Sequence, residues 1–212
     1  MSRLSEELDI LINRTRELQP EERIDPKPDF EDPPPERTSR KMVRGLTPRE
    51  EKYGFDNFQG NEKLTSAIRE LVNSGASVLL TGATGCGKTH LAIAAAKASA
   101  RPAVFVTVPD LLLGIRSSFG RGREGSERTL IEYYSRAELL VLDDLGAEKS
   151  TEYSIQTLYT IISRRNRMEA QTIVTTNLSV RQIAEVLGDR IASRLAEMKI
   201  VKINMPDYRT RR

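Results

Sequence analysis

The stretch GATGCGKT, residues 82–89, fits the pattern G-x-x-x-x-G-K-[ST] and follows an apolar run from Ser77 to Leu80. Glycines let the backbone turn tightly and aim its N–H groups at phosphate oxygens, and the helix expected after the loop points its positive end at them. In such a loop the lysine, Lys88, reaches the β and γ phosphates and the threonine, Thr89, binds Mg²⁺. The stretch therefore predicts a phosphate-binding loop between a strand and a helix. We expect the nucleotide to contact this loop and the residue after it: Gly82, Ala83, Thr84, Gly85, Cys86, Gly87, Lys88, Thr89 and His90.

The composition is that of a globular protein. Hydrophobic residues make up 38% and charged residues 30% of the 212 residues, and no apolar run approaches the length that spans a membrane. The first ten residues, MSRLSEELDI, lack the apolar core of a secretory signal. One cysteine and one histidine exclude an internal disulfide and a cysteine-rich zinc module, so we interpret Cys86 and His90 as structural. We expect a cytoplasmic protein that does not bind a membrane.

Charge is distributed unevenly along the chain. Residues 1–36 hold eleven acidic and five basic residues, a net charge of −6, and the remaining 28 basic and 19 acidic residues give +9. A basic body favours a polyanion such as nucleic acid, whereas an acidic arm favours a protein partner. Solvated charge without a partner is the alternative for either part.

The sequence pattern of the amino-terminal region predicts a helix and a linker ahead of the main domain. Leucines and a threonine recur at helical spacing and form one apolar stripe, Leu4, Leu8, Leu11, Thr15 and Leu18. We expect residues 1–19 to form a helix that docks on a partner, with a self-packed or dimeric helix as the alternative. Residues 20–52 are rich in proline and charge and predict a linker, and residues 53–212 form the main domain.

Within that domain, apolar runs alternate with helical patterns. The expected strands are Ser77–Thr81, Ala103–Val108, Glu138–Asp143, Thr172–Thr176 and Ile200–Ile203. The expected helices are Glu62–Asn73, Lys88–Ala100, Pro109–Ser118, Ser126–Ser135, Thr151–Arg167 and Val180–Glu197. Strands of nearly continuous Val, Leu and Ile that are separated by helices predict an α/β fold with a parallel sheet covered on both faces.

Polar residues follow two of these strands. Asp143 and Asp144 end one, and Asn177 follows another. A parallel sheet places its ligands at the carboxyl edge of the strands, where these side chains would meet the phosphates. Asp143 fits the Mg²⁺-linked carboxylate of an ATPase, and Asp144 a group that orients or deprotonates the attacking water. Asn177 can hydrogen-bond both the γ-phosphate and water, or it can cap the next turn.

Four segments together, GATGCGKTHL, LLVLDDLGAEKS, TTN and LGDRIASRL, resemble the AAA+ ATPases of the DnaC/DnaI helicase-loader and IstB transposition-helper group. The resemblance covers roughly residues 53–212. It implies an AAA+ core with a five-stranded parallel sheet, ATP and Mg²⁺ bound at a subunit interface, and a homo-oligomer. Because the chain ends at Arg212, soon after the fifth strand, we expect the helical lid domain of larger members to be largely absent.

The resemblance also implies roles for arginines. Arg194 corresponds to a finger that acts on the nucleotide of a neighbouring subunit, with Arg190 as the alternative, and Arg209 corresponds to a second sensor of the nucleotide. A guanidinium placed at the γ-phosphate neutralises charge in the transition state.

Members that load helicases carry a DNA-binding insertion where this chain has a basic, glycine-rich loop after residue 119. The arginines there predict sequence-independent contacts to single-stranded DNA, with a solvated loop as the alternative: Arg116, Arg121, Arg123 and Arg128. Phe55 and Phe58, ahead of the first core helix, are expected to pack in the core, with a wall for the adenine as the alternative.

The first hypothesis is an ATP-dependent loader of a replicative hexameric helicase. In this hypothesis the amino-terminal helix binds the helicase, and the main domain oligomerises with ATP and binds single-stranded DNA. ATP hydrolysis then drives release. The second is a transposition helper ATPase that assembles on duplex DNA. A small-molecule P-loop kinase fits the motifs less well. A non-hydrolysing nucleotide-gated adaptor is a further alternative, because Asp144 is shorter than the glutamate common at that position.

Overall fold

The computed structural model describes residues 43–99, 101–118, 126–147 and 150–207. The chain divides into two compact units, Met1–Glu36 and Arg37–Arg212, and all described residues belong to the second. The expected amino-terminal helix and most of the expected linker lie outside the described residues. No helix within these ranges has both the length and the apolar character needed to cross a membrane.

A six-stranded sheet forms the centre of the second unit, and every pairing in it is parallel. In spatial order its strands are β1 (Val43–Arg44), β3 (Ala103–Thr107), β4 (Leu139–Leu145), β5 (Gln171–Thr176), β2 (Val78–Gly82) and β6 (Lys199–Ile203). The α/β class and the five expected strands are confirmed. The sixth, β1, is only two residues long, too short to give a recognisable apolar pattern, and it pairs with β3 at the edge.

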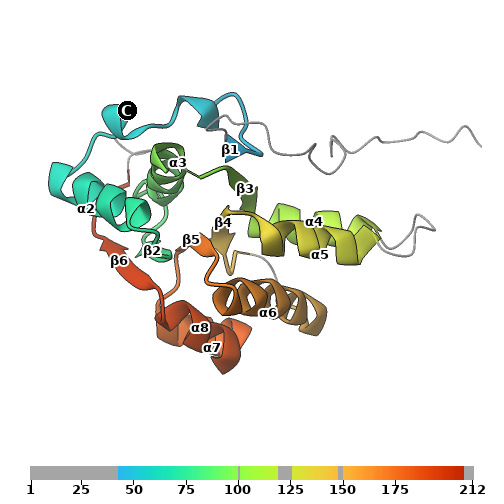
Figure 1. Ribbon diagram of the computed structural model, residues 1–212. Helices are drawn as coiled ribbons and strands as arrows, with labels where there is room; N and C mark the ends of the chain where they lie inside the picture. Colours follow the sequence, from blue (N-terminus) through green and yellow to red (C-terminus); the bar gives the residue numbers. More distant parts are fainter. Residues whose placement is uncertain (1–42, 100, 119–125, 148–149, 208–212) are drawn as a thin grey trace, which may run out of the picture. The chain divides into compact units, whose positions relative to one another are not determined.

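Helices cover both faces of this sheet (Figure 1). On one face lie α2 (Glu62–Asn73) and α3 (Lys88–Ala98), and two short 3₁₀ turns, η1 (Glu50–Lys52) and η2 (Phe55–Asn57), precede them. On the other lie α4 (Val108–Ser117), α5 (Ser126–Arg136), α6 (Glu152–Arg167), α7 (Val180–Leu187) and α8 (Asp189–Ala196).

The strand β4 shows how the sequence produces these layers. Its residues 139–142 are all fully buried, and successive side chains point to opposite faces. Leu140 and Leu142 join the cluster under α4 to α8, whereas Leu139 and Val141 join the cluster under α2 and α3. Burying each such side chain contributes about 1.5–3 kcal/mol, so an uninterrupted apolar run stabilises a strand only when both faces are covered.

The prediction of one helix over Val180–Glu197 is wrong, because the chain forms two helices there. Gly188 separates them with φ 90° and ψ 156°, a conformation that is accessible essentially only to glycine. Its N–H still donates to the carbonyl of Ala184, which closes α7, and α8 begins at the next residue. The apolar stripe continues across the break, so periodicity alone did not reveal it.

Arg165 of α6 connects α5 to the two strands, β4 and β5, that lead to the polar residues described below. Its side chain is 1% exposed, and burial lowers its pKa to about 10, so the guanidinium stays charged. It donates to the carbonyl oxygens of Tyr134, Ser135, Ala137 and Gln171 at 2.6–3.1 Å and to Thr172 Oγ1 at 2.9 Å. The end of α5 and the beginnings of β4 and β5 are therefore fixed to one rigid fork.

Candidate functional site

The strand register brings three polar segments together at the carboxyl edge of the sheet. Thr81 of β2 lies opposite Thr176 of β5, so the loop at 82–89 begins beside Asn177. Across from β5, the register of β4 shifts between Leu142 and Leu145, which places Asp143 and Asp144 in a β-bulge. Bulges redirect side chains near functional sites, and this one lies at the end of the strand where a ligand is expected.

The loop at residues 82–89 has the geometry that its glycines predict. Gly85 and Gly87 have φ of 78° and 90°, and α3 begins immediately afterwards at Lys88. A Cβ on Gly87 would lie 2.7 Å from Cε2 of Phe58. Glycine is therefore required at this position for its backbone conformation and for the close approach of the Phe58 ring.

Lys88 is 5% exposed and its ammonium group has three oxygen partners. It donates to the carbonyls of Gly82 at 3.0 Å and Ala83 at 2.8 Å, and to Oδ1 of Asn177 at 2.5 Å. The structure thus joins the loop lysine to Asn177, which the sequence placed at the same edge from a different strand. All three partners are neutral, so an anionic phosphate would be a stronger partner for this cation.

Asp143 is 2% exposed and lies between two threonine hydroxyls. Thr89 Oγ1 donates to Oδ2 at 3.0 Å, and Thr175 Oγ1 donates to Oδ1 at 2.7 Å. Burial is the main cause that raises the pKa of Asp143 to about 6, and the nearby charge of Asp144 acts in the same direction. The hydrogen bonds from Thr175 and Thr89 oppose this shift.

This pair of oxygen donors suits Mg²⁺. The cation prefers carboxylate and hydroxyl oxygens and usually keeps several of its waters, so it needs few protein ligands. Thr89 and Asp143 are hydrogen-bonded to each other, and a buried carboxylate with a raised pKa has much to gain from a nearby cation. The residues present therefore fit the ion that the sequence motif implies.

Asp144 has a left-handed backbone, with φ of 56°, and its side chain is half-buried and lines the pocket described below. Its N–H donates to Thr175 Oγ1 at 3.0 Å. Thr175 thus holds both members of the Asp-Asp pair, a role that sequence reasoning missed. The TTN segment was recognised, but only the bulge shows why its first threonine matters.

A pocket of about 490 Å³ opens over the loop and contains most of the expected nucleotide residues. Thr84, Gly85, Gly87, Lys88, Thr89, His90, Asp144 and Asn177 all line it. Sequence reasoning missed part of its wall: Arg49, Tyr53, Asn57, Gln59 and Ala147. The aromatic segment YGFDNF was the available signal, and Phe58, weighed as an adenine wall, does line the pocket while also packing against the core.

His90 joins this wall to α3. Its ring stacks on Tyr53 with centroids 4.6 Å apart and an interplanar angle of 11°, and it meets Phe58 edge-on. Nε2 lies 2.8 Å from the carbonyl of Gly54, which can only accept, so this nitrogen carries the proton. Burial lowers the pKa of His90, which favours the neutral ring; the bond to Gly54 opposes this shift and the charge of Lys97 adds to it.

The expected arginines that the structure describes do not line this pocket. Arg194 of α8 bonds Glu197 at 3.1 Å and Asn166 at 3.4 Å, and its side chain remains 42% exposed. Arg190 lies over the ring of Tyr159 at 5.9 Å. Arg116 and Arg128 are exposed on α4 and α5. The remaining expected contacts lie outside the described residues: Arg121, Arg123 and Arg209.

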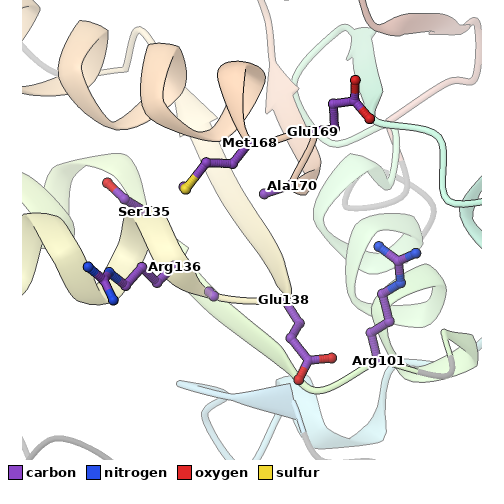
Figure 2. Close-up of a pocket in the computed structure, with 8 residues that line it drawn as sticks. Arg101, Ser135, Arg136, Glu138, Met168, Glu169 and Ala170 are labelled. Carbon is purple, nitrogen blue, oxygen red and sulfur yellow. The ribbon is translucent and has the colours of Figure 1, made fainter.

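A second pocket, of about 340 Å³, lies at the opposite edge of the sheet, near the beginnings of the strands (Figure 2). Its wall mixes charges of both signs, including Arg101, Glu138 and Glu169, around Met168 and Ala170. Because parallel sheets bind ligands at the carboxyl edge of their strands, the pocket over the phosphate loop is the candidate site.

Comparison with known proteins agrees with this assignment. The model of the IstB-like ATP binding protein family matches residues 50–212. The replicative helicase loader DnaC of Escherichia coli strain K12 is 27% identical over 180 residues, which cover 79% of this chain and 73% of that protein.

Solved structures give the same result. The crystal structure of the DnaC helicase loader aligns with a TM-score of 0.65 and 26% identity, over 74% of this chain and 99% of that one. The replication initiator DnaA bound to AMPPCP and single-stranded DNA shares the fold, with a TM-score of 0.63 and 22% identity over 76% of this chain and 51% of its own. The chain therefore belongs to the IstB-like ATP binding protein family, within the AAA+ ATPases of the DnaC/IstB group.

Proposed function

We propose that this chain is an ATPase that loads a replicative DNA helicase onto single-stranded DNA. The observation that carries the ATPase part is the joining of two pairs across the sheet edge, Lys88 with Asn177 and Thr89 with Asp143. The loader part is supported by the similarity to replicative helicase loaders over most of the chain.

In the proposed reaction each polar side chain of the edge has a separate task. Lys88 would leave its neutral partners and bind the β and γ phosphates. Thr89 and Asp143 would hold Mg²⁺, which would supply positive charge near the phosphate oxygens. Asp144, held at the bulge by Thr175, orients the attacking water. Asn177, released by Lys88, donates its amide to the γ-phosphate.

A second copy of the chain is proposed to complete the site. Arg194 does not line the pocket of its own chain, and its partly exposed side chain can reach a neighbour. Supplied in trans, such an arginine accelerates phosphoryl transfer by roughly 10³ to 10⁵. Nucleotide binding and assembly would then be linked.

We propose that basic residues of the main domain contact DNA and that the acidic amino-terminal region contacts the helicase. The exposed arginines of α4 and α5, Arg116 and Arg128, together with Arg121 and Arg123, would bind phosphates of single-stranded DNA. The acidic residues 1–36 would repel DNA and bind the helicase.

Measurements of ATP turnover, ATP binding and helicase retention test this proposal. ATP turnover should be lost in Asp144→Asn while ATP still binds, and both should be lost in Lys88→Met. In a pull-down, the full chain should retain a hexameric helicase, and a variant that lacks residues 1–36 should not. If the full chain retains no helicase, or if wild-type turnover in the presence of DNA and helicase equals that of Lys88→Met, the proposal is wrong.

The alternative is a transposition helper of the IstB kind, which would share the same ATP-binding family. It predicts ATP-dependent filaments on duplex DNA. Electron microscopy of the full chain with ATP, on duplex and on single-stranded DNA, separates the two functions, because the loader is expected to assemble on single strands.

A further inference from the structure

Lys97 lies in the last turn of α3, the helix that begins at the phosphate loop, and its ammonium group donates to backbone carbonyls. Its ammonium group donates to the carbonyl oxygens of Glu51 at 2.5 Å and Tyr53 at 2.8 Å, and to that of Glu50 at 3.5 Å. The three donors of one ammonium group are thus used on three carbonyls around the end of η1.

His90 makes a similar contact from the same helix. It lies seven residues before Lys97, two turns along one face of α3, and its Nε2 donates to the carbonyl of Gly54 while its ring stacks on Tyr53. Four carbonyl groups of residues 50–54 are therefore held by two side chains of α3.

The segment held in this way forms one side of the pocket over the phosphate loop. We call it the nucleoside wall and define it as residues 49–59, of which Arg49, Tyr53, Asn57, Phe58 and Gln59 line the pocket. The other side of the pocket is the loop itself with Lys88. The wall thus faces the part of a nucleotide that lies beyond the phosphates.

We propose that Lys97 is a positioning residue that fastens the nucleoside wall to α3, so that the wall binds the base and ribose in register with phosphates held at the start of the same helix. Lys97 does not line the pocket, so it acts through the wall. This inference rests on the proposed nucleotide site and adds a determinant of the preference for nucleoside triphosphate over bare phosphate.

The physical reason is the nature of the contacts. The wall consists of two short 3₁₀ turns and connecting chain, and two such turns stabilise themselves poorly. Hydrogen bonds from a charged donor are the stronger kind, and Lys97 supplies three of them. Without them the wall samples more conformations, and ordering it on binding reduces the affinity for the base. The phosphate loop keeps its own backbone geometry and Lys88.

The test compares two probes, ATP and inorganic tripolyphosphate, by titration calorimetry with Mg²⁺ on the full chain. The variants are Lys97→Met, which keeps most of the length of the side chain but removes its charge, and Lys97→Arg, which keeps charged donors. Lys63→Met serves as the matched control, because Lys63 is an exposed lysine of α2. Thermal unfolding of each variant is recorded alongside.

We expect Lys97→Met to weaken ATP binding about tenfold, the equivalent of one lost charged hydrogen bond, and to leave tripolyphosphate binding within about twofold of wild type. Lys97→Arg should recover most of the ATP affinity, and Lys63→Met should match wild type. Equal losses for both probes, or none for ATP, would overturn the inference. If wild type itself fails to bind ATP, the proposed function is what fails.

Discussion

Replacing Asp143 by Asn should stabilise the protein above about pH 6, in the absence of nucleotide and Mg²⁺. Asp143 is 2% exposed, and its pKa of about 6 exceeds the ordinary value of 3.8. A carboxyl whose pKa is raised on folding binds its proton more tightly in the folded state. It therefore favours folding below the unfolded pKa, and this contribution is lost as pH rises from about 4 to about 6. A difference of about two units corresponds to about 3 kcal/mol of unfolding free energy.

The assay is chemical denaturation of wild type and Asp143→Asn in chelator, at several values between about pH 4 and about pH 7.5. The stability of the variant minus that of wild type should rise by about 3 kcal/mol across the interval and then level off above about pH 6. Altered hydrogen bonds to Thr89 and Thr175 add a constant offset without changing this shape. Asp56→Asn, at an exposed carboxylate of η2, serves as the matched control. A difference for Asp143→Asn that does not change with pH would refute the reasoning.

The remaining predictions concern packing and backbone conformation. In the same denaturation assay, Arg165→Met should cost about 3–5 kcal/mol of unfolding free energy, because four buried or partly buried carbonyls lose a charged donor. Arg136→Met, on the exposed end of α5, should cost less than about 1 kcal/mol. Gly87→Ala and Gly188→Ala should each cost about 1–3 kcal/mol, since both glycines have φ of 90°. Only Gly87→Ala should also weaken ATP binding in calorimetry, because its Cβ meets Phe58 and that of Gly188 meets nothing within 4 Å. Equal loss of ATP affinity in both would mean that backbone strain alone is responsible.

The sequence predicts this fold well where a residue pattern corresponds to a local physical requirement. Apolar runs produced the five longer strands, most clearly β4, whose residues 139–142 are buried on both faces. Gly85 and Gly87 of the phosphate loop adopt the positive φ that their positions demand. Gly188 shows the limit of such patterns. A glycine within an apolar stripe is compatible with one helix or with two, and only the packing of α7 and α8 against the core decides between them.

In the candidate site, the polar residues near the strand ends were predictable from the sequence, whereas the nucleoside wall was not. Lys88, Asp143 and Asn177 follow recognisable strand ends, so the parallel topology alone brings them together. Lys97, in contrast, acts on carbonyl groups, which every residue possesses and which leave no trace in the sequence. Thr175 acquires its role from a β-bulge, and a register shift of this kind depends on the neighbouring strand.

The buried charges of this site connect its stability to its binding. Lys88 is 5% exposed and meets three neutral oxygens, and Asp143 is 2% exposed and meets two hydroxyls. Each is a charged group taken from water with only dipoles as partners, which costs the folded protein free energy. A phosphate bound by Lys88 and a cation bound by Asp143 would restore that loss. The same desolvation that destabilises the free protein would therefore strengthen the binding of a magnesium nucleotide. We expect Asp143→Asn also to lose magnesium-dependent nucleotide binding, so that this loss and the expected gain in stability are two measures of one electrostatic cost.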